Sequence, residues 1–379
     1  MQQSHAFVLR FRSFASIPHD TFRAHAQGPL FRFTRRPTEE LLIFLVVKMN
    51  PRLPPELIHL IIKASLDPHD PIHDSCHLQR YSTLRYFSGV NSEWFDFSDP
   101  LLYEFVVITS QDAAMAFLDL CAVNGGTMKG VRSMKVSPTI RCLNEGILGM
   151  LLKSVPLART LELRGIEVDW SDLAPLQHLE RLFMFSTIVH SSSPTTASPL
   201  PRLRHLHTHR VDFSRSADHF LVPSFLPRLR AWSFLPPNTP SRPLEPLFPQ
   251  LHAVSLAYMN DCELFLPHAT SLQLLDIDSL SQQREISSFL GATLRFIRLR
   301  VAEGEEEAAN ELLDEHIAGS KSELETMFLD APSGMGGEVS ESQRVGALRE
   351  KGVEVVKGAI GFWDAVERME RIMSREGEE

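Results

Sequence analysis

A short apolar pattern recurs along the C-terminal two thirds of the chain and constrains the fold more than any other feature. It consists of an apolar residue, two others, an apolar residue, one other and a last apolar residue, as in Leu179, Leu182 and Met184. The alternation in its second half is that of a short strand with every second side chain in a core. So small a unit buries too little apolar surface to fold alone, and we therefore expect stacked units that form a solenoid. Copies begin at Val131, Ala158, Leu179, Leu203, Leu229, Leu251, Leu272, Leu294 and Leu324, with Thr208 in the last place of the fourth.

Successive copies start 21 to 30 residues apart, and most of these steps lie within the roughly 20–29 residues that are typical of leucine-rich repeats. Prolines between the predicted strands favour turns or extended returns, while 144–155 and 305–318 have the pattern of helical returns. We expect an α/β fold with a helical connector over 108–130 and a degenerate leucine-rich-repeat solenoid over 131–361. A last strand at 353–356 and an amphipathic helix at 362–374, within a C-terminal segment 362–379, are expected to cap its open end.

Composition and charge exclude several classes of protein. Hydrophobic residues make up 43% of the chain and charged residues 22%, values typical of a globular protein rather than of a disordered or collagen-like one. The longest apolar run, Leu41–Val47, is far shorter than the ~20 residues of a membrane span. A net charge of -9 offers nucleic acid no basic field. Cysteines at 76, 121, 142 and 262 have no CxxC spacing and favour a reducing, cytoplasmic or nuclear compartment.

Residues 1–48 differ from the rest of the chain, with six arginines but only one acidic residue, Asp20, before Pro37. We expect a disordered N-terminal extension, or a start codon assigned ahead of the true one at Met49. A mitochondrial targeting sequence is the alternative, because such sequences are rich in arginine and poor in acids.

Residues 49–107 have the composition of a compact helical unit. Leu57, Leu60 and Ile61 follow helical spacing after Pro54 and Pro55, and proline is tolerated in the first turn of a helix. A second amphipathic helix is predicted further on, and the polar stretch 67–79 between the two reads as an inserted loop. The apolar residues of this second helix are Tyr81, Leu84, Phe87, Val90 and Trp94.

Three motifs in this unit resemble the F-box. They are Leu53-Pro54-Pro55-Glu56-Leu57-Ile58, Val90-Asn91-Ser92-Glu93-Trp94 and Ser98-Asp99-Pro100-Leu101-Leu102-Tyr103. Tyr103 stands where tryptophan is commoner in the F-box, and the stretch 67–79 is longer than the usual link. With the repeats that follow, the layout resembles the F-box/leucine-rich-repeat proteins of fungi, especially the mushroom-forming basidiomycetes.

The resemblance implies a role as an adaptor-docking substrate receptor. F-box proteins dock onto the adaptor subunit of SCF-type cullin–RING ubiquitin ligases, and their C-terminal repeats hold the protein substrate. Two alternative functions remain: a repeat scaffold that binds a partner without ligase coupling, or a hydrolase or transferase hidden in the repeats. Leu57, Ile61 and Trp94 could also simply pack the helices against the repeats. Carried over by position, the adaptor-facing residues are Leu53, Pro54, Leu57, Ile61, Val90 and Trp94.

No catalytic motif supports the enzyme alternative. Neither a phosphate-binding GxxxxGK[ST] loop nor a GxSxG nucleophile elbow occurs in the sequence. We therefore expect no enzymatic activity and no cofactor.

Strand alternation also predicts the substrate face. The third, fifth and seventh positions of each repeat point away from the core, into the concave surface. Two exposed aromatics there, Phe183 and Phe185, are unfavourable unless a partner covers them, and Asp276 and Arg298 could either pair with each other or bind a partner. Three histidines at alternate positions from 205 to 209 lack a nearby carboxylate or cysteine, which favours polar contacts over a zinc site. The predicted substrate-binding residues are Phe183, Phe185, His207, His209, Asp276 and Arg298.

Overall fold

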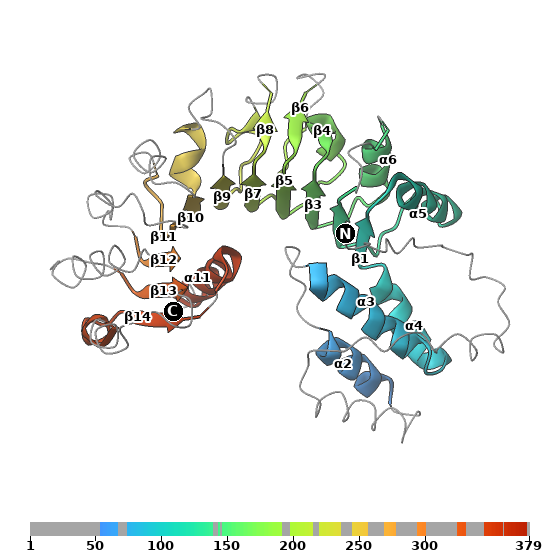
Figure 1. The fold of residues 1–379 in the computed structure, drawn as a ribbon, viewed down its shortest axis with the longest axis horizontal. Coiled ribbons are helices and arrows are strands. Elements are labelled where there is room, and N and C mark those ends of the chain that lie inside the picture. The colour runs from blue at the N-terminus through green and yellow to red at the C-terminus, as the bar shows by residue number, and fades with distance from the viewer. Residues whose placement is uncertain are drawn as a thin grey trace, which may run out of the picture.

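The computed structural model describes residues 54–66, 74–138, 143–144, 146–191, 198–214, 220–235, 245–256, 269–277, 294–300, 324–330, 345–358 and 360–376. Within these residues the chain forms a curved solenoid around a parallel sheet of 11 strands (Figure 1). The strand order is β1-β2-β3-β5-β7-β9-β10-β11-β12-β13-β14, so the strands follow one another in the order of the sequence. This arrangement is a leucine-rich-repeat-like solenoid, as the repeat pattern predicted.

Each of the nine copies of the pattern forms a strand. These are β2 (Ser133–Val136), β3 (Thr160–Arg164), β5 (Arg181–Phe185), β7 (His205–His209), β9 (Ala231–Leu235), β10 (Ala253–Leu256), β11 (Leu274–Ile277), β12 (Phe296–Arg300) and β13 (Thr326–Asp330). The expected last strand is β14 (Glu354–Lys357). An unexpected strand, β1 (Phe105–Ile108), pairs with β2. The sheet therefore begins inside the segment assigned to the helical unit, well before residue 131.

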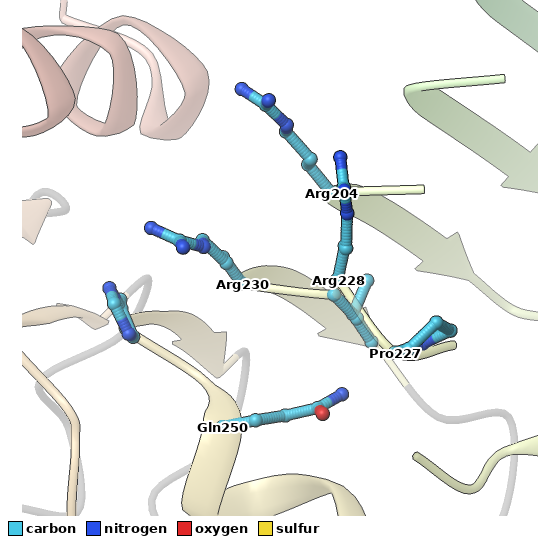
Figure 2. A pocket seen from close by; sticks show the side chains of 7 residues that line it. Arg204, Pro227, Arg228, Arg230 and Gln250 are labelled. Atoms are coloured by element: carbon cyan, nitrogen blue, oxygen red, sulfur yellow. The ribbon is translucent and has the colours of Figure 1, made fainter. Parts of the chain in front are cut away.

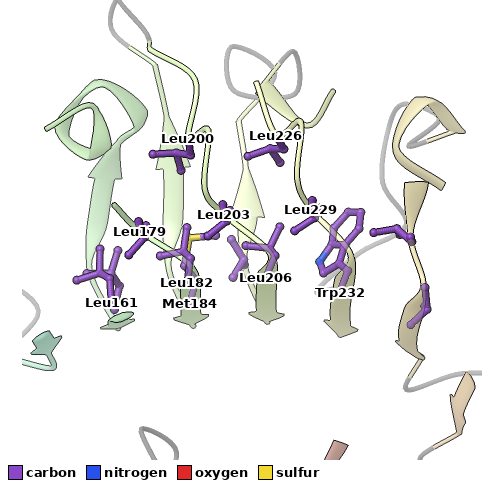
Figure 3. Close-up of a cluster of buried hydrophobic side chains, with 14 of the residues drawn as sticks. Leu161, Leu179, Leu182, Met184, Leu200, Leu203, Leu206, Leu226, Leu229 and Trp232 are labelled. Atoms are coloured by element: carbon purple, nitrogen blue, oxygen red, sulfur yellow. The ribbon is translucent and has the colours of Figure 1, made fainter. Parts of the chain in front are cut away.

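The apolar positions of the repeats form one continuous core between the sheet and the returning segments (Figure 3). Leu182 pairs in register with Leu161 on one side and Leu206 on the other, and all three are fully buried. The polar Thr208 is accommodated because the Trp232 indole Nε1 donates a hydrogen bond of 3.0 Å to its Oγ1. The core therefore runs through the repeats without leaving this hydroxyl unpaired.

The returning segments change in character along the chain. The first two contain α5 (Gln111–Val123), in the predicted helical connector, and α6 (Ile147–Ser154), in the predicted return 144–155. A second, three-stranded parallel sheet of β4 (Glu167–Asp169), β6 (Ile188–His190) and β8 (Asp212–Phe213) joins the next returns, and 3-10 turns lie at η3 (Trp170–Leu173) and η5 (Glu245–Gln250). The other predicted helical return, 305–318, lies outside the described residues.

The described residues of the N-terminal unit form three helices, α2 (Pro55–Ser65), α3 (Asp74–Ser88) and α4 (Ser92–Leu102). The second predicted helix is in fact two, because Asn91 caps α4: its side chain accepts a hydrogen bond of 3.0 Å from the Trp94 backbone N–H. Since α3 begins at Asp74, residues 74–79 of the expected loop 67–79 are helical. No helix in the described part of the chain is both long and apolar enough to cross a membrane.

The C-terminal helix α11 (Phe362–Glu376) is present where the sequence predicted it, but it does not cap the end of the solenoid. It lies in the concavity of the sheet (Figure 1) and packs against β11 and β12. The physical reason is that the concave face offers an apolar strip that matches the apolar face of the helix.

Candidate functional site

The concave face of the C-terminal repeats is covered by the chain's own α11. On the helix, Phe362, Ala365, Val366 and Met369 turn toward the sheet and are buried. They pack on an apolar strip of the sheet formed by Ala231, Ala253, Leu274, Phe296 and Phe328. The two alanines of this strip leave room for the helix backbone to approach, and burial of the whole strip removes the free-energy cost of exposing it to water.

One ion pair and one hydrogen bond fix the polar edge of α11 to the sheet. Glu367 lies 2.7 Å from the Arg181 guanidinium, and Glu370 lies 3.2 Å from His205 Nε2. Burial alone would raise the pKa of Glu370, but its hydrogen bond to His205 and the charges of His205, Arg204 and Arg181 lower it overall. Glu370 is therefore held in its charged form, which strengthens the contact with His205.

Asp276 and Arg298 pair with each other, which is one of the two outcomes expected from the sequence. Their side chains are 2.6 Å apart and both are buried. Arg298 Nε also donates a hydrogen bond of 2.6 Å to the backbone carbonyl of Ile360, just before α11. The pair therefore anchors the start of the helix. The substrate-binding role expected for these two residues does not fit this burial, because α11 and its entry segment cover them.

Phe183 faces the concave side as predicted, but it is not open to a partner. It is 2% exposed, and its ring contacts the Trp363 ring of α11 edge to face, with centroids 5.5 Å apart. Trp363 also lies 5.3 Å from the His205 ring. The strand register is therefore right, while the expectation that Phe183 awaits an external partner is wrong, because α11 supplies the covering aromatic.

Four residues of β3, β5 and β7 form a surface that we call the aromatic patch: Arg164, Phe185, His207 and His209. The Arg164 guanidinium lies 4.3 Å from the centre of the Phe185 ring, within cation–π distance. Ring centroids are 4.8 Å apart for Phe185 and His207, and 6.4 Å apart for the nearly parallel His207 and His209. Three of the six predicted substrate-binding residues thus come together in one partly exposed patch.

The aromatic patch carries its positive charge on Arg164 rather than on His207. Burial, together with the nearby His209 and Arg164, lowers the pKa of His207 to about 3, so this imidazole is neutral at physiological pH. Beneath the patch, Glu162 is buried between Lys135, at 2.9 Å, and Arg164. The patch therefore presents flat ring faces and one guanidinium, a chemistry common at protein interfaces.

The predicted adaptor-facing residues separate into a buried and an exposed group. Trp94 is fully buried and packs on Phe87 with ring centroids 5.2 Å apart, so it is a core residue of the helical unit and not a contact surface. Ile61 and Val90 are half-buried against that core. Pro54 and Leu57 are exposed, and Leu53 lies outside the described residues.

One exposed residue of α2, Leu60, was not predicted as part of the docking surface. It is 64% exposed, and Leu57, one turn earlier, is 47% exposed. The spacing of Leu57, Leu60 and Ile61 places all three on one face of the helix. This helical spacing, which is visible in the sequence, could have placed Leu60 on the docking surface. The comparison with the F-box motifs alone did not include it.

The described residues give no sign of a metal site or a reactive thiol. No group of three or more histidine, cysteine or acidic side chains in this part of the chain could hold a metal ion. The buried Cys121 is a free cysteine, and burial raises the pKa of its thiol despite a hydrogen bond with Ser154. A raised pKa makes a thiol a poor nucleophile.

Comparison with known proteins finds similarity among solved structures but none among family models or curated proteins. Among solved structures, the chain is similar to an internalin, inlF, from Listeria monocytogenes str. 4b F2365, with a TM-score of 0.30 and 13% sequence identity. The match covers 58% of this chain and 64% of the internalin, so the chain spans less than two thirds of the structure it matches.

Phe183 and Phe185 both face the concave side in the repeat pattern, but only Phe183 is fully covered in the structure. Changing the covered Phe183 to Ala should lower the free energy of unfolding by about 3–5 kcal/mol, because it leaves a cavity beneath Trp363. The same change at the half-exposed Phe185 should lower it by about 1 kcal/mol. Urea denaturation measures both losses. Equal losses would show that α11 does not cover Phe183.

The neutral His207 should make the protein less stable in mild acid. Its pKa is lowered in the folded state, so below pH ~6.5 the unfolded chain takes up a proton that the folded chain refuses until about pH 3. The contribution of His207 to the free energy of unfolding is therefore fully present above pH ~6.5. It falls by roughly 1 kcal/mol per pH unit as the pH drops toward 3. Urea denaturation from pH 7 to 4 should show a shallower loss for His207→Asn than for the wild type. His178→Asn is the control, and an identical slope in all three proteins would contradict the burial of His207.

Proposed function

We propose that this chain is a substrate receptor of an SCF-type ubiquitin ligase. In this proposal α2–α4 form an F-box that docks the adaptor subunit, and through it a cullin, in the cytoplasm or nucleus. The solenoid binds a protein substrate. The observation that carries the proposal is an exposed apolar stripe on α2 formed by Leu57 and Leu60, with the half-buried Ile61 at its edge.

The stripe is exposed because α2 has two apolar faces and the helical unit buries only one. Ile58 and Ile62 are fully buried beside Trp94, while Leu57 and Leu60 on the other face point outward. Burial of a leucine side chain gives about 1.5–3 kcal/mol. A second apolar face is therefore unfavourable on its own and is typical of a helix that docks onto a partner.

The remaining helices of the unit add to this exposed apolar surface. Half of the large hydrophobic side chains that the described residues leave exposed belong to α2–α4, although these helices are a small part of the chain. They are Leu57, Leu60, Tyr86 and Phe95. This concentration agrees with the three F-box-like motifs, which fall in the same helices.

The aromatic patch supports the second half of the proposal. Phe185, the two histidines and Arg164 offer ring faces and a guanidinium, the side-chain types that are enriched where proteins bind proteins. Because α11 covers the C-terminal half of the concave face and also contacts β5 and β7, we place the substrate over the aromatic patch, at the carboxyl ends of β3, β5 and β7.

A non-ligase interaction scaffold is the second candidate. One observation favours it: the ion pairs and apolar contacts of α11 occupy much of the surface that a repeat protein would use for a substrate. In such a scaffold the stripe on α2 would serve a partner other than the ligase adaptor.

Replacing Leu57 and Leu60 together with Ser should abolish adaptor binding by the full chain. Buried apolar anchors contribute about 2–4 kcal/mol each to such an interface, so we expect a loss of at least about 100-fold in affinity. Both side chains are exposed, and the melting temperature should therefore change little. Co-purification and calorimetry with the adaptor measure the two effects.

Met115 and Val123 provide a matched control, since both are exposed apolar residues of α5. Changing both to Ser should leave adaptor binding intact. A wild-type chain that fails to bind the adaptor at micromolar concentrations, with or without residues 67–73, would rule out the ligase and leave the scaffold. Unchanged binding by the Leu57/Leu60 variant would rule out the stripe as the contact.

A further inference from the structure

The residue that follows the first apolar position of each repeat forms a row along one edge of the sheet, which we call the edge row. Backbone hydrogen bonds link each member to the next: the Arg230 N–H donates to the Arg204 carbonyl at 2.9 Å, and the His252 N–H donates to the Arg230 carbonyl at 2.7 Å. Neighbouring members are therefore one strand spacing apart, roughly 4.8 Å. The row is Arg132, Arg159, Glu180, Arg204, Arg230, His252, Gln273, Arg295 and Glu325.

Opposite charges pair on both sides of the row but not in its middle. Arg159 lies 3.9 Å from Glu180, and Arg295 makes a two-point contact with Glu325 at 2.5 and 2.6 Å. Between these pairs, Arg204, Arg230 and His252 follow one another without an acidic residue. Adjacent like charges on neighbouring strands destabilise a sheet, so this arrangement is unfavourable without a counter-charge.

A fourth basic residue joins the same place. Arg228, from the turn before β9, lines a cavity of about 480 Å³ together with Arg204, Arg230, Gln250 and His252. Figure 2 shows the side chains of Arg204, Arg228 and Arg230 extending from neighbouring segments in the same general direction, with α11 beyond them. All three arginines are exposed, so a ligand from solution can reach them.

The described residues supply little negative charge to this cavity. None of them places a carboxylate within ion-pair distance of Arg204, Arg228 or Arg230, although the whole chain carries a net charge of -9. The acidic group that does influence the cavity is Glu370 of α11, whose pKa Arg204 helps to lower and whose Oε1 is engaged by His205. Of the three arginines only Arg204 acts on Glu370, which Arg181 and His205 also influence, so the three guanidinium groups leave a local excess of positive charge.

We infer that this cavity, which we call the arginine pocket, binds a phosphate-class oxyanion with two or more negative charges through Arg204, Arg228 and Arg230. The guanidinium group suits this ligand because its planar N–H donors form paired hydrogen bonds with two oxygens of a phosphate. A dianion also removes the repulsion between the arginines. The inference stands independently of the proposed function, because the pocket is remote in sequence from α2 and uses other residues.

Two kinds of ligand carry such an oxyanion: a free polyphosphate, or a polypeptide with a phosphate group. Isothermal titration of the full chain with pyrophosphate and with a short phosphoserine peptide distinguishes them. We expect one site per chain for the stronger probe. Tighter binding of the peptide than of pyrophosphate identifies a phosphorylated polypeptide as the ligand, and the reverse order identifies a free polyanion.

The decisive variant changes Arg204 and Arg230 together to Gln. It should weaken binding of the stronger probe by about tenfold or more, because it removes two charge-assisted contacts. The control changes two exposed arginines outside the pocket, Arg202 and Arg349, to Gln and removes the same charge. It should bind as the wild type does, and melting curves check that both variants fold.

Two results would overturn the inference. One is no saturable binding of either probe by the wild type at millimolar concentration. The other is equal weakening in the Arg204/Arg230 variant and in the Arg202/Arg349 control, which would show a general charge effect and not a pocket.

Discussion

Each repeat of this chain is too small to keep its apolar residues out of water, and this constraint governs the whole structure. Leu182 is buried only because Leu161 and Leu206 lie beside it on the neighbouring strands. The backbone ladder from β1 to β14 holds the repeats in this register. Stability is therefore shared between neighbouring repeats, as in other solenoids, and every apolar surface that stacking leaves open needs a cover from elsewhere in the chain.

The concave face shows how the chain provides that cover. Ala253, Leu274 and Phe296 would form an apolar strip facing water if α11 did not lie on them. The buried Arg298, bonded to Asp276 and to the Ile360 carbonyl, fixes the start of the helix. Removing one member of a buried ion pair leaves the other charge buried without a partner, which strongly destabilises the fold. Helix α11 therefore belongs to the solenoid, and the concave surface left for a partner lies over the earlier repeats.

Local sequence patterns predicted the strands but not the surfaces they form. The two-residue alternation of a strand is a local property, so Leu229, Trp232 and Phe234 were enough to place β9. The amphipathic face of α11 was also readable, but which surface it covers depends on residues far away in the sequence. Phe183 was assigned correctly to the concave face and wrongly to a partner for the same reason.

In the helical unit, the sequence alone does not distinguish buried apolar residues from exposed ones. The spacing of Leu57 and Trp94 marks both as apolar positions of amphipathic helices, and the resemblance to the F-box gave both the same role. The structure separates them, since Trp94 fills the core between helices while Leu57 remains exposed. The edge row went unnoticed because its charges gain meaning only when neighbouring repeats are placed side by side.

Hydrogen–deuterium exchange of the full chain tests most directly whether α11 is a built-in part of the concave face. We expect the backbone amides of residues 366–374 to exchange as slowly as those of β10–β12, because helix and strands are protected by the same contacts. Exchange of the α11 amides at nearly unprotected rates, while the strands remain protected, would contradict it. The concave face would then be open along its whole length.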